Sequence, residues 1–110
     1  MSQSGEIHVT HTENIIAVDL PASSLTEEHL DATRHKLFRL AEGLGAAELR
    51  VDFAKITAIG SSALGMLLTL HRRATKAGGH LALCGLAPHL QQLLRLIRLD
   101  TILDVRKGQS

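Results

Sequence analysis

Apolar and polar residues alternate in two short segments near the start of the chain. Residues 6–12 carry Ile7 and Val9 in alternation, and residues 14–20 are rich in isoleucine, valine and leucine. A short polar link joins the two segments, and Pro21 follows the second. Alternation with a period of two is typical of half-buried strands, and proline ends a strand because it lacks a backbone N–H donor. The pattern therefore predicts an N-terminal β-hairpin.

Apolar residues recur every three or four positions in three other segments, which is the period of an amphipathic helix. The first helix is expected to start at Ser24, which forms a Ser-x-x-Glu capping box with Glu27. Ser61 or Ser62 is expected to cap the second, which is apolar around most of its circumference, and Pro88 lies in the first turn of the third. The expected core positions of the helices are Leu30, Thr33, Leu37, Leu40, Ala41 and Leu44, then Leu64, Met66, Leu67, Leu68 and Leu70, and then Leu90, Leu93, Leu94 and Ile97.

Further strand-like segments alternate with these helices. They lie at residues 48–53, 80–84 and 102–105. A hairpin pairs antiparallel, whereas strands linked through helices pair in parallel. The sequence therefore predicts an α/β fold with a mixed sheet, a leading β-hairpin and helices packed on the sheet, and it leaves open which strand is central. We expect one domain over residues 1–110, with polar ends at about 1–5 and 106–110.

The composition narrows the classes of function. The chain has 110 residues, of which 45% are hydrophobic and 21% charged, and its 12 basic and 11 acidic residues leave a net charge of +1. It has no Trp or Tyr and only two Phe, so it lacks both the concentrated basic face and the aromatic platform that nucleic-acid binding uses. The single cysteine, Cys84, fits a reducing compartment and is expected to be a small core residue. No apolar run approaches ~20 residues. These features predict a cytoplasmic domain with no direct nucleic-acid partner and no membrane insertion.

The sequence carries no recognisable pattern for catalysis or metal binding. His8 and His11 are three apart on a predicted strand, so they face opposite sides. His29 and His35 are six apart on a predicted helix, which is not a facing distance either. Ser61 lacks the Gly-x-Ser-x-Gly surroundings of a hydrolase nucleophile, and no dinucleotide-binding or P-loop glycine pattern occurs. We therefore expect a protein that is not an enzyme, with no metal and no cofactor.

Two adjacent serines stand where the second helix is expected to begin. Ser61 and Ser62 follow a predicted strand and a connecting loop. One interpretation is capping, because a serine at the N-cap contributes ~1 kcal/mol by bonding a free backbone N–H. The other is a phosphorylation switch. A phosphate would bring nearly two negative charges to a helix N-terminus, where free N–H groups and the helix dipole tolerate an anion, and it would repel a docked partner.

Several short pieces of the chain keep the order and spacing of one known family. They are Val51-Asp52-Phe53, Ile59 to Gly65, Leu70-His71-Arg72-Arg73, Ala77-Gly78-Gly79, Leu81 to Gly85, Pro88 and Arg98-Leu99-Asp100. From about residue 49 to residue 105 the sequence thus resembles a STAS domain, the fold of bacterial anti-sigma factor antagonists. The predicted hairpin and first helix agree with the family in order but not in residues.

The resemblance implies a role for the start of the second helix. In such antagonists an Asp-Ser-Ser/Thr-Gly motif opens this helix, and the partner anti-sigma kinase phosphorylates the first serine and binds the unphosphorylated form. Carried over to this chain, the motif implies that Ser61 is the phosphoacceptor and that Gly60, Ser62 and Ala63 belong to the partner-binding surface. The chain departs from the motif at two positions, where Gly60 replaces the Asp and Ala63 replaces the Gly.

The loop after the second predicted strand forms the other part of the partner-facing surface in this family. Ser23 and Ser24 lie there, in place of the family's Gly-Glu-Leu-Asp stretch. The resemblance implies a regulatory domain that binds an anti-sigma factor or a related kinase-fold protein, and a homo-oligomer stays open. Because the motif departs at two positions, a second interpretation also stays open: a constitutive scaffold or accessory STAS subunit of a signalling or transporter complex, without phosphorylation.

Overall fold

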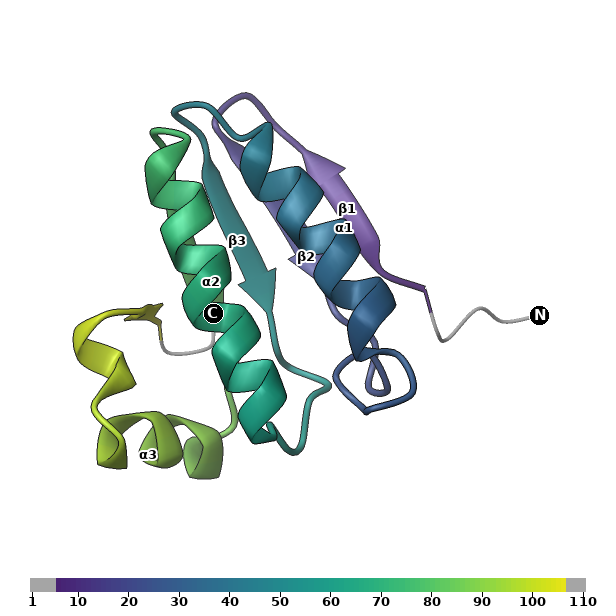
Figure 1. Cartoon of the computed structure of the whole chain (residues 1–110), viewed down its shortest axis with the longest axis vertical. Helices are drawn as coiled ribbons and strands as arrows, with labels where there is room; N and C mark the ends of the chain where they lie inside the picture. Colours follow the sequence, from purple (N-terminus) through teal and green to yellow (C-terminus); the bar gives the residue numbers. More distant parts are fainter. Residues whose placement is uncertain (1–5, 107–110) are drawn as a thin grey trace.

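The chain folds into a five-stranded sheet with helices over one face, and the computed structural model describes residues 6–106. The strands are β1 (His8–His11), β2 (Ile15–Asp19), β3 (Glu48–Asp52), β4 (His80–Cys84) and β5 (Asp104–Val105). The helices are α1 (Leu30–Glu42), α2 (Ser61–Lys76), α3 (Pro88–Leu96) and the 3-10 helix η1 (Leu99–Thr101). Figure 1 shows α1 and α2 side by side over the sheet, with α3 near its lower end.

The mixed sheet predicted from the sequence is confirmed. β1 and β2 pair antiparallel, with Val9 opposite Val18, and the Thr12 N–H closes their link by donating to the Ile15 carbonyl at 2.8 Å. All later neighbours pair in parallel, in the order β1-β2-β3-β4-β5. The central strand is therefore β3, which answers the question that the order of elements left open. The predicted polar residues 1–5 and 107–110 lie outside the described part of the chain.

The two faces of the sheet differ in polarity. Val18, Val51 and Leu83 are register partners on β2, β3 and β4, and each is at most 1% exposed beneath the helices. One position further along, Asp19 and Asp52 are register partners on the opposite face, where both are half-buried. Because successive strand residues point to opposite faces, the sheet has one apolar face packed by helices and one polar face.

Helix α1 begins later than the sequence predicts. Its first residue is Leu30, and its N-cap is His29, whose side chain makes no capping bond. Ser24 is only 3% exposed and donates its hydroxyl to the Pro21 carbonyl at 2.7 Å. The Thr33 hydroxyl in turn donates to the Ser24 carbonyl at 2.7 Å. The predicted capping box is wrong because this serine bonds to the backbone of a local turn and does not start the helix.

The C-terminal part of the chain departs from expectation in three places. The last strand is limited to β5, and Ile102, predicted to belong to it, is 50% exposed. Ile97 is 44% exposed although it was expected in the core, because α3 has ended and the chain turns away through Arg98, which has a left-handed φ of 63°. Cys84 is half-buried on the polar face of the sheet, outside the core. The remaining helical core positions are buried or half-buried as predicted.

Gly79 lies between α2 and β4 at a point where the backbone approaches another segment closely. A Cβ atom there would lie 2.4 Å from the Ala47 carbonyl oxygen and 2.6 Å from that of Gly45. Gly79→Ala is therefore expected to lower the free energy of unfolding by ~1–3 kcal/mol, measured by urea denaturation. Gly65 in α2 is the matched control. A Cβ there meets no atom within 4 Å, so Gly65→Ala is expected to raise the same free energy by ~0.5–1 kcal/mol. An unchanged stability of Gly79→Ala would contradict this packing.

Candidate functional site

Two loops leave the sheet at the same edge. β2 and β3 are parallel neighbours that end together, with Asp19 paired to Asp52, so the segments that follow them lie side by side. Figure 1 shows both loops at the bottom of the molecule, together with the first turn of α2. Lys55 Nζ of the second loop lies 3.4 Å from the Asp19 carboxylate. The two loops line a shared hollow, to which the first contributes Pro21 and Ser23 and the second contributes Lys55.

The loop between β3 and α2 is held by buried isoleucines. Ile56 is 2% exposed and Ile59 is 8% exposed, so both side chains belong to the core. At its start, the Ala54 N–H donates to Asp52 Oδ1 at 2.9 Å, and the Ile56 N–H donates to the Phe53 carbonyl at 2.9 Å. Anchored in this way, the loop presents the start of α2 at a defined position.

Helix α2 begins without a side-chain cap. Gly60 is the N-cap, in an extended conformation, and its carbonyl accepts the first helical bond from the Leu64 N–H at 3.0 Å. Ser61 and Ser62 are the first two helical residues, both are exposed, and no side-chain bond caps the helix. The prediction that one of these serines caps α2 is therefore wrong. They lie one and two residues after the N-cap, and both are open to solvent.

The six predicted partner-binding residues divide into two groups. Gly60, Ser61 and Ser62 are exposed and Ser23 is half-buried, and all four lie at the same end of the sheet. Ser24 and Ala63 are 3% and 1% exposed. Both side chains are buried in this fold, where Ser24 holds the first loop and Ala63 packs α2 against the core, and their part in partner contact stays a prediction.

Sequence reasoning missed a residue that borders this region. The exposed His89, in the first turn of α3, donates from Nε2 to the Thr57 carbonyl at 2.7 Å. This bond joins the start of α3 to the loop before α2. The two residues are 32 positions apart, and no local pattern signals such a contact.

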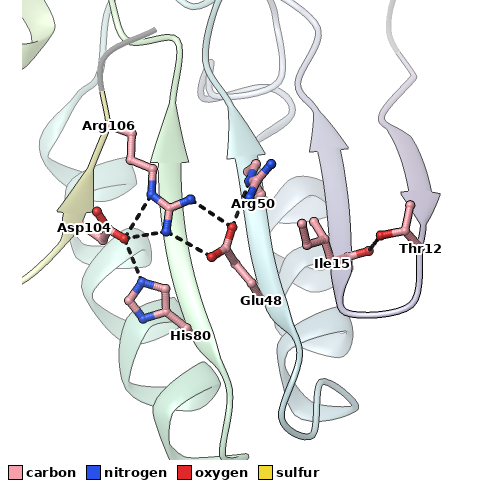
Figure 2. A network of polar contacts seen from close by, with 7 residues as sticks. All are labelled: Thr12, Ile15, Glu48, Arg50, His80, Asp104 and Arg106. Atoms are coloured by element: carbon pink, nitrogen blue, oxygen red, sulfur yellow. Dashed lines mark hydrogen bonds and ion pairs between the residues drawn. The ribbon is translucent and has the colours of Figure 1, made fainter. Parts of the chain in front are cut away.

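A second polar cluster lies on the uncovered face of the sheet (Figure 2). Arg106 donates to Glu48 at 2.9 Å and to Asp104 at 2.8 Å. Glu48 also accepts a bond from Arg50 at 2.8 Å, and His80 Nε2 lies 2.7 Å from Asp104 Oδ2. The bonds connect β5 to β3 across β4. Arg106, the first residue of the predicted polar C-terminal end, follows β5 and contributes its side chain to this cluster.

The cluster makes stability depend on pH. Partial burial opposes ionisation of Glu48, but hydrogen bonds from Arg106 and Arg50 outweigh it and hold the pKa of Glu48 below its usual value of 4.5. The hydrogen bond from His80, supported by Arg106, likewise lowers the pKa of Asp104 below its usual value of 3.8, against the effect of burial. A depressed carboxyl pKa favours the folded state above the pKa of the unfolded chain, and this contribution disappears as the pH falls through the folded value.

Arg106 is the cation that bonds both carboxylates, so its removal should make the free energy of unfolding depend less on pH below neutrality. Arg106→Gln is expected to cost about 1 kcal/mol of unfolding free energy at pH 7 and much less at pH 3, because partly exposed ion pairs have modest strength. Urea denaturation at the two pH values measures the difference. Arg34→Gln, which removes an exposed pair with Asp31, is the control and should keep the wild-type profile. A pH-independent loss in Arg106→Gln would show that its charge is not what stabilises the cluster.

The described residues contain no group of metal ligands, and their one thiol, Cys84, is not activated. Within residues 6–106, no three His, Cys, Asp or Glu side chains gather in a way that could hold a metal. Burial raises the pKa of the Cys84 thiol, which disfavours the nucleophilic thiolate. In the same part of the chain, every helix is too short or too polar to cross a membrane.

Comparison with known proteins gives a consistent result. A family model described as "Mlab, STAS domain" matches residues 8–104. A STAS domain protein from Planctomyces limnophilus is 20% identical with a TM-score of 0.81, over 94% of this chain and 91% of that one. A candidate anti-sigma factor antagonist from Thermotoga maritima is 18% identical with a TM-score of 0.80, over 94% and 86%. The Bacillus cell fate determinant SpoIIAA, in its phosphorylated form, is 14% identical with a TM-score of 0.69, over 96% and 93%. No curated protein matches the chain. At these identities the structural likeness establishes the fold.

Proposed function

This chain belongs to the STAS domain family described as "Mlab, STAS domain", and we propose that it is a regulatory domain that docks a protein partner through the first turn of α2 and the neighbouring loops. In this proposal phosphorylation of Ser61 switches the docking off. The domain acts by presenting a surface, with no catalytic step of its own. We place it in the cytoplasm, where the partner is an anti-sigma factor or a related kinase-fold protein.

The exposure of Ser61 is the observation that carries the proposal. Its hydroxyl makes no capping bond, and the first turn of α2 contains no acidic residue. The positive end of the helix dipole and the free N–H groups of the first turn tolerate an added phosphate. The fold can therefore survive modification at the position where the surface changes most.

A phosphate here would change the local charge strongly. Each phosphate adds close to two negative charges at neutral pH, which would take the net charge of the chain from +1 to about −1. A partner packed against Ser61 and Ser62 would meet both the added bulk and the dianion. Among the structural neighbours, SpoIIAA has been solved in a phosphorylated form, which supports a switch of this kind.

Gly60, one of the two departures from the family motif, has room for a larger side chain. A Cβ at Gly60 would meet no atom within 4 Å, and the residue has φ −84° and ψ 175°, a conformation open to any residue. Glycine here thus reflects no steric demand of the fold. Because the motif's Asp is missing, a constitutive scaffold or accessory STAS subunit of a signalling or transporter complex remains the second candidate function.

Affinity purification from the native host separates the two candidates. The wild-type chain serves as bait, and mass spectrometry identifies both the co-purifying proteins and any phosphate on Ser61. We expect a protein with a kinase-type ATP-binding fold in the bound fraction, and Ser61 phosphate in the fraction without it. A stable complex in which Ser61 is never phosphorylated under any growth condition would favour the scaffold.

A further inference from the structure

A groove runs between α1 and α2 on the outer side of the helical layer. Figure 1 shows the C-terminal ends of both helices at the top of the molecule, opposite the end where α2 begins. The residues that line the groove are Glu42, Thr69, Arg72, Arg73, Lys76 and Ala77. Arg72 lies about 16 Å from Ser61 along the helix axis, at 1.5 Å per residue. The groove is therefore separate from the proposed switch surface.

The charge of α2 is concentrated in this groove. The helix contains Arg72, Arg73 and Lys76 and no Asp or Glu. All three cations are exposed, and with Thr69 they are spaced three and four residues apart, so they share one face of the helix. A chain with a net charge of only +1 thus carries three positive charges on two turns of a single helix.

One carboxylate already occupies part of the groove. The guanidinium of Arg73 forms an ion pair with Glu42 of α1, and its Cζ lies 4.4 Å from the centre of the Phe38 ring. This cation–π contact holds the guanidinium beside the ring, and the planar fork of an arginine suits recognition of a carboxylate. The pair shows that a carboxylate fits between the two helices at this point.

The other two cations have no such partner among residues 6–106. Arg72 makes one long bond, from Nη2 to Thr69 Oγ1 at 3.4 Å, and neither Arg72 nor Lys76 forms an ion pair within the described residues. Their charges are therefore available to an external anion. A hollow between two helices suits a linear chain better than a flat bilayer surface.

We propose that this groove docks an acidic segment of a partner protein, whose carboxylates pair with Arg72 and Lys76 beside the internal pair of Arg73 and Glu42. Complementary charge of this kind speeds association and selects the partner. This docking does not depend on Ser61. The C-terminal end of α2 can therefore hold a partner while phosphorylation changes the N-terminal end.

The test uses the full chain and a fluorescein-labelled peptide of alternating Glu and Ala, with binding followed by fluorescence anisotropy at low ionic strength. Arg72→Glu/Lys76→Glu is expected to raise the Kd at least about tenfold, equivalent to ~1.4 kcal/mol. Glu42→Gln removes the internal competitor and is expected to lower the Kd roughly two- to fivefold. Added salt should weaken the wild-type complex.

Lys36→Glu/Arg95→Glu is the matched control, since it reverses one Lys and one Arg that are exposed elsewhere on α1 and α3. It makes the same change in net charge and is expected to shift the Kd no more than about twofold; Ser61→Asp is expected to have as small an effect. Equal losses in the two charge-reversed proteins would overturn the proposal, because net charge alone would explain them. Absence of peptide binding by wild type would also overturn it. Binding to phosphatidylglycerol vesicles but not to the peptide would replace the protein partner with a membrane surface.

Discussion

Replacing Ser61 by Asp is expected to leave the fold intact and to weaken binding of the protein captured by the wild-type bait about 30-fold or more. Loss of a central interface residue costs ~2 kcal/mol or more, which corresponds to that factor. Ser61 is exposed in the first turn of α2, where no acidic residue is present, so a carboxylate there interacts favourably with the helix dipole. The melting temperature should therefore stay equal to that of wild type or rise slightly.

Thermal denaturation and a titration against the captured protein measure the two effects separately. Ser61→Ala keeps the surface uncharged and is expected to retain both stability and binding. Gln92→Glu adds one negative charge to an exposed position of α3 and controls for the change in net charge. Equal affinity of wild type and Ser61→Asp would remove the basis of the switch.

Phe53→Ala is expected to lower the free energy of unfolding by ~3–5 kcal/mol, the largest change in stability among these substitutions. Phe53 is fully buried, and it is the residue at which the chain leaves β3 for the loop that leads to Ser61. Removal of its ring leaves a cavity under that loop. Because small domains have a free energy of unfolding of only about 5–15 kcal/mol, a loss of this size removes a large part of the stability of the domain.

Urea denaturation at 25 °C tests this value, and Phe53→Leu is the matched control. Leucine keeps most of the buried volume and is expected to cost less than about 1.5 kcal/mol. If Phe53→Ala and Phe53→Leu lower the free energy of unfolding equally, the buried ring does not stabilise the loop before α2.

The sequence predicts most of the architecture because the elements follow local patterns. The hairpin, the alternation of strands with helices and the first-turn position of Pro88 all depend on residues that are close in the chain. The capping predictions fail for a different reason. A serine before an apolar stretch marks a turn near a helix start, but whether its hydroxyl caps the helix depends on where the helix begins: Ser61 lies one residue after the N-cap Gly60, and Ser24 lies in a turn well before the N-cap His29.

The candidate site is predictable only in part. The position of Ser61 at the start of a helix can be predicted from the sequence, whereas its exposure is seen only in the structure. The bond of His89 to the loop before α2, and the ion pair of Arg73 with Glu42, join residues 32 and 31 positions apart. Such contacts are set by how the helices pack on the sheet. A single sequence shows the charges but not which of them meet.

The most direct test of the switch compares one chain in two chemical states. The wild-type protein and the same protein carrying phosphoserine at position 61 are titrated into the partner captured from the native host, and the two Kd values are measured by calorimetry. The proposed function predicts tight binding by the unmodified chain and binding at least about 30-fold weaker by the phosphorylated chain. Equal Kd values for the two forms would contradict it.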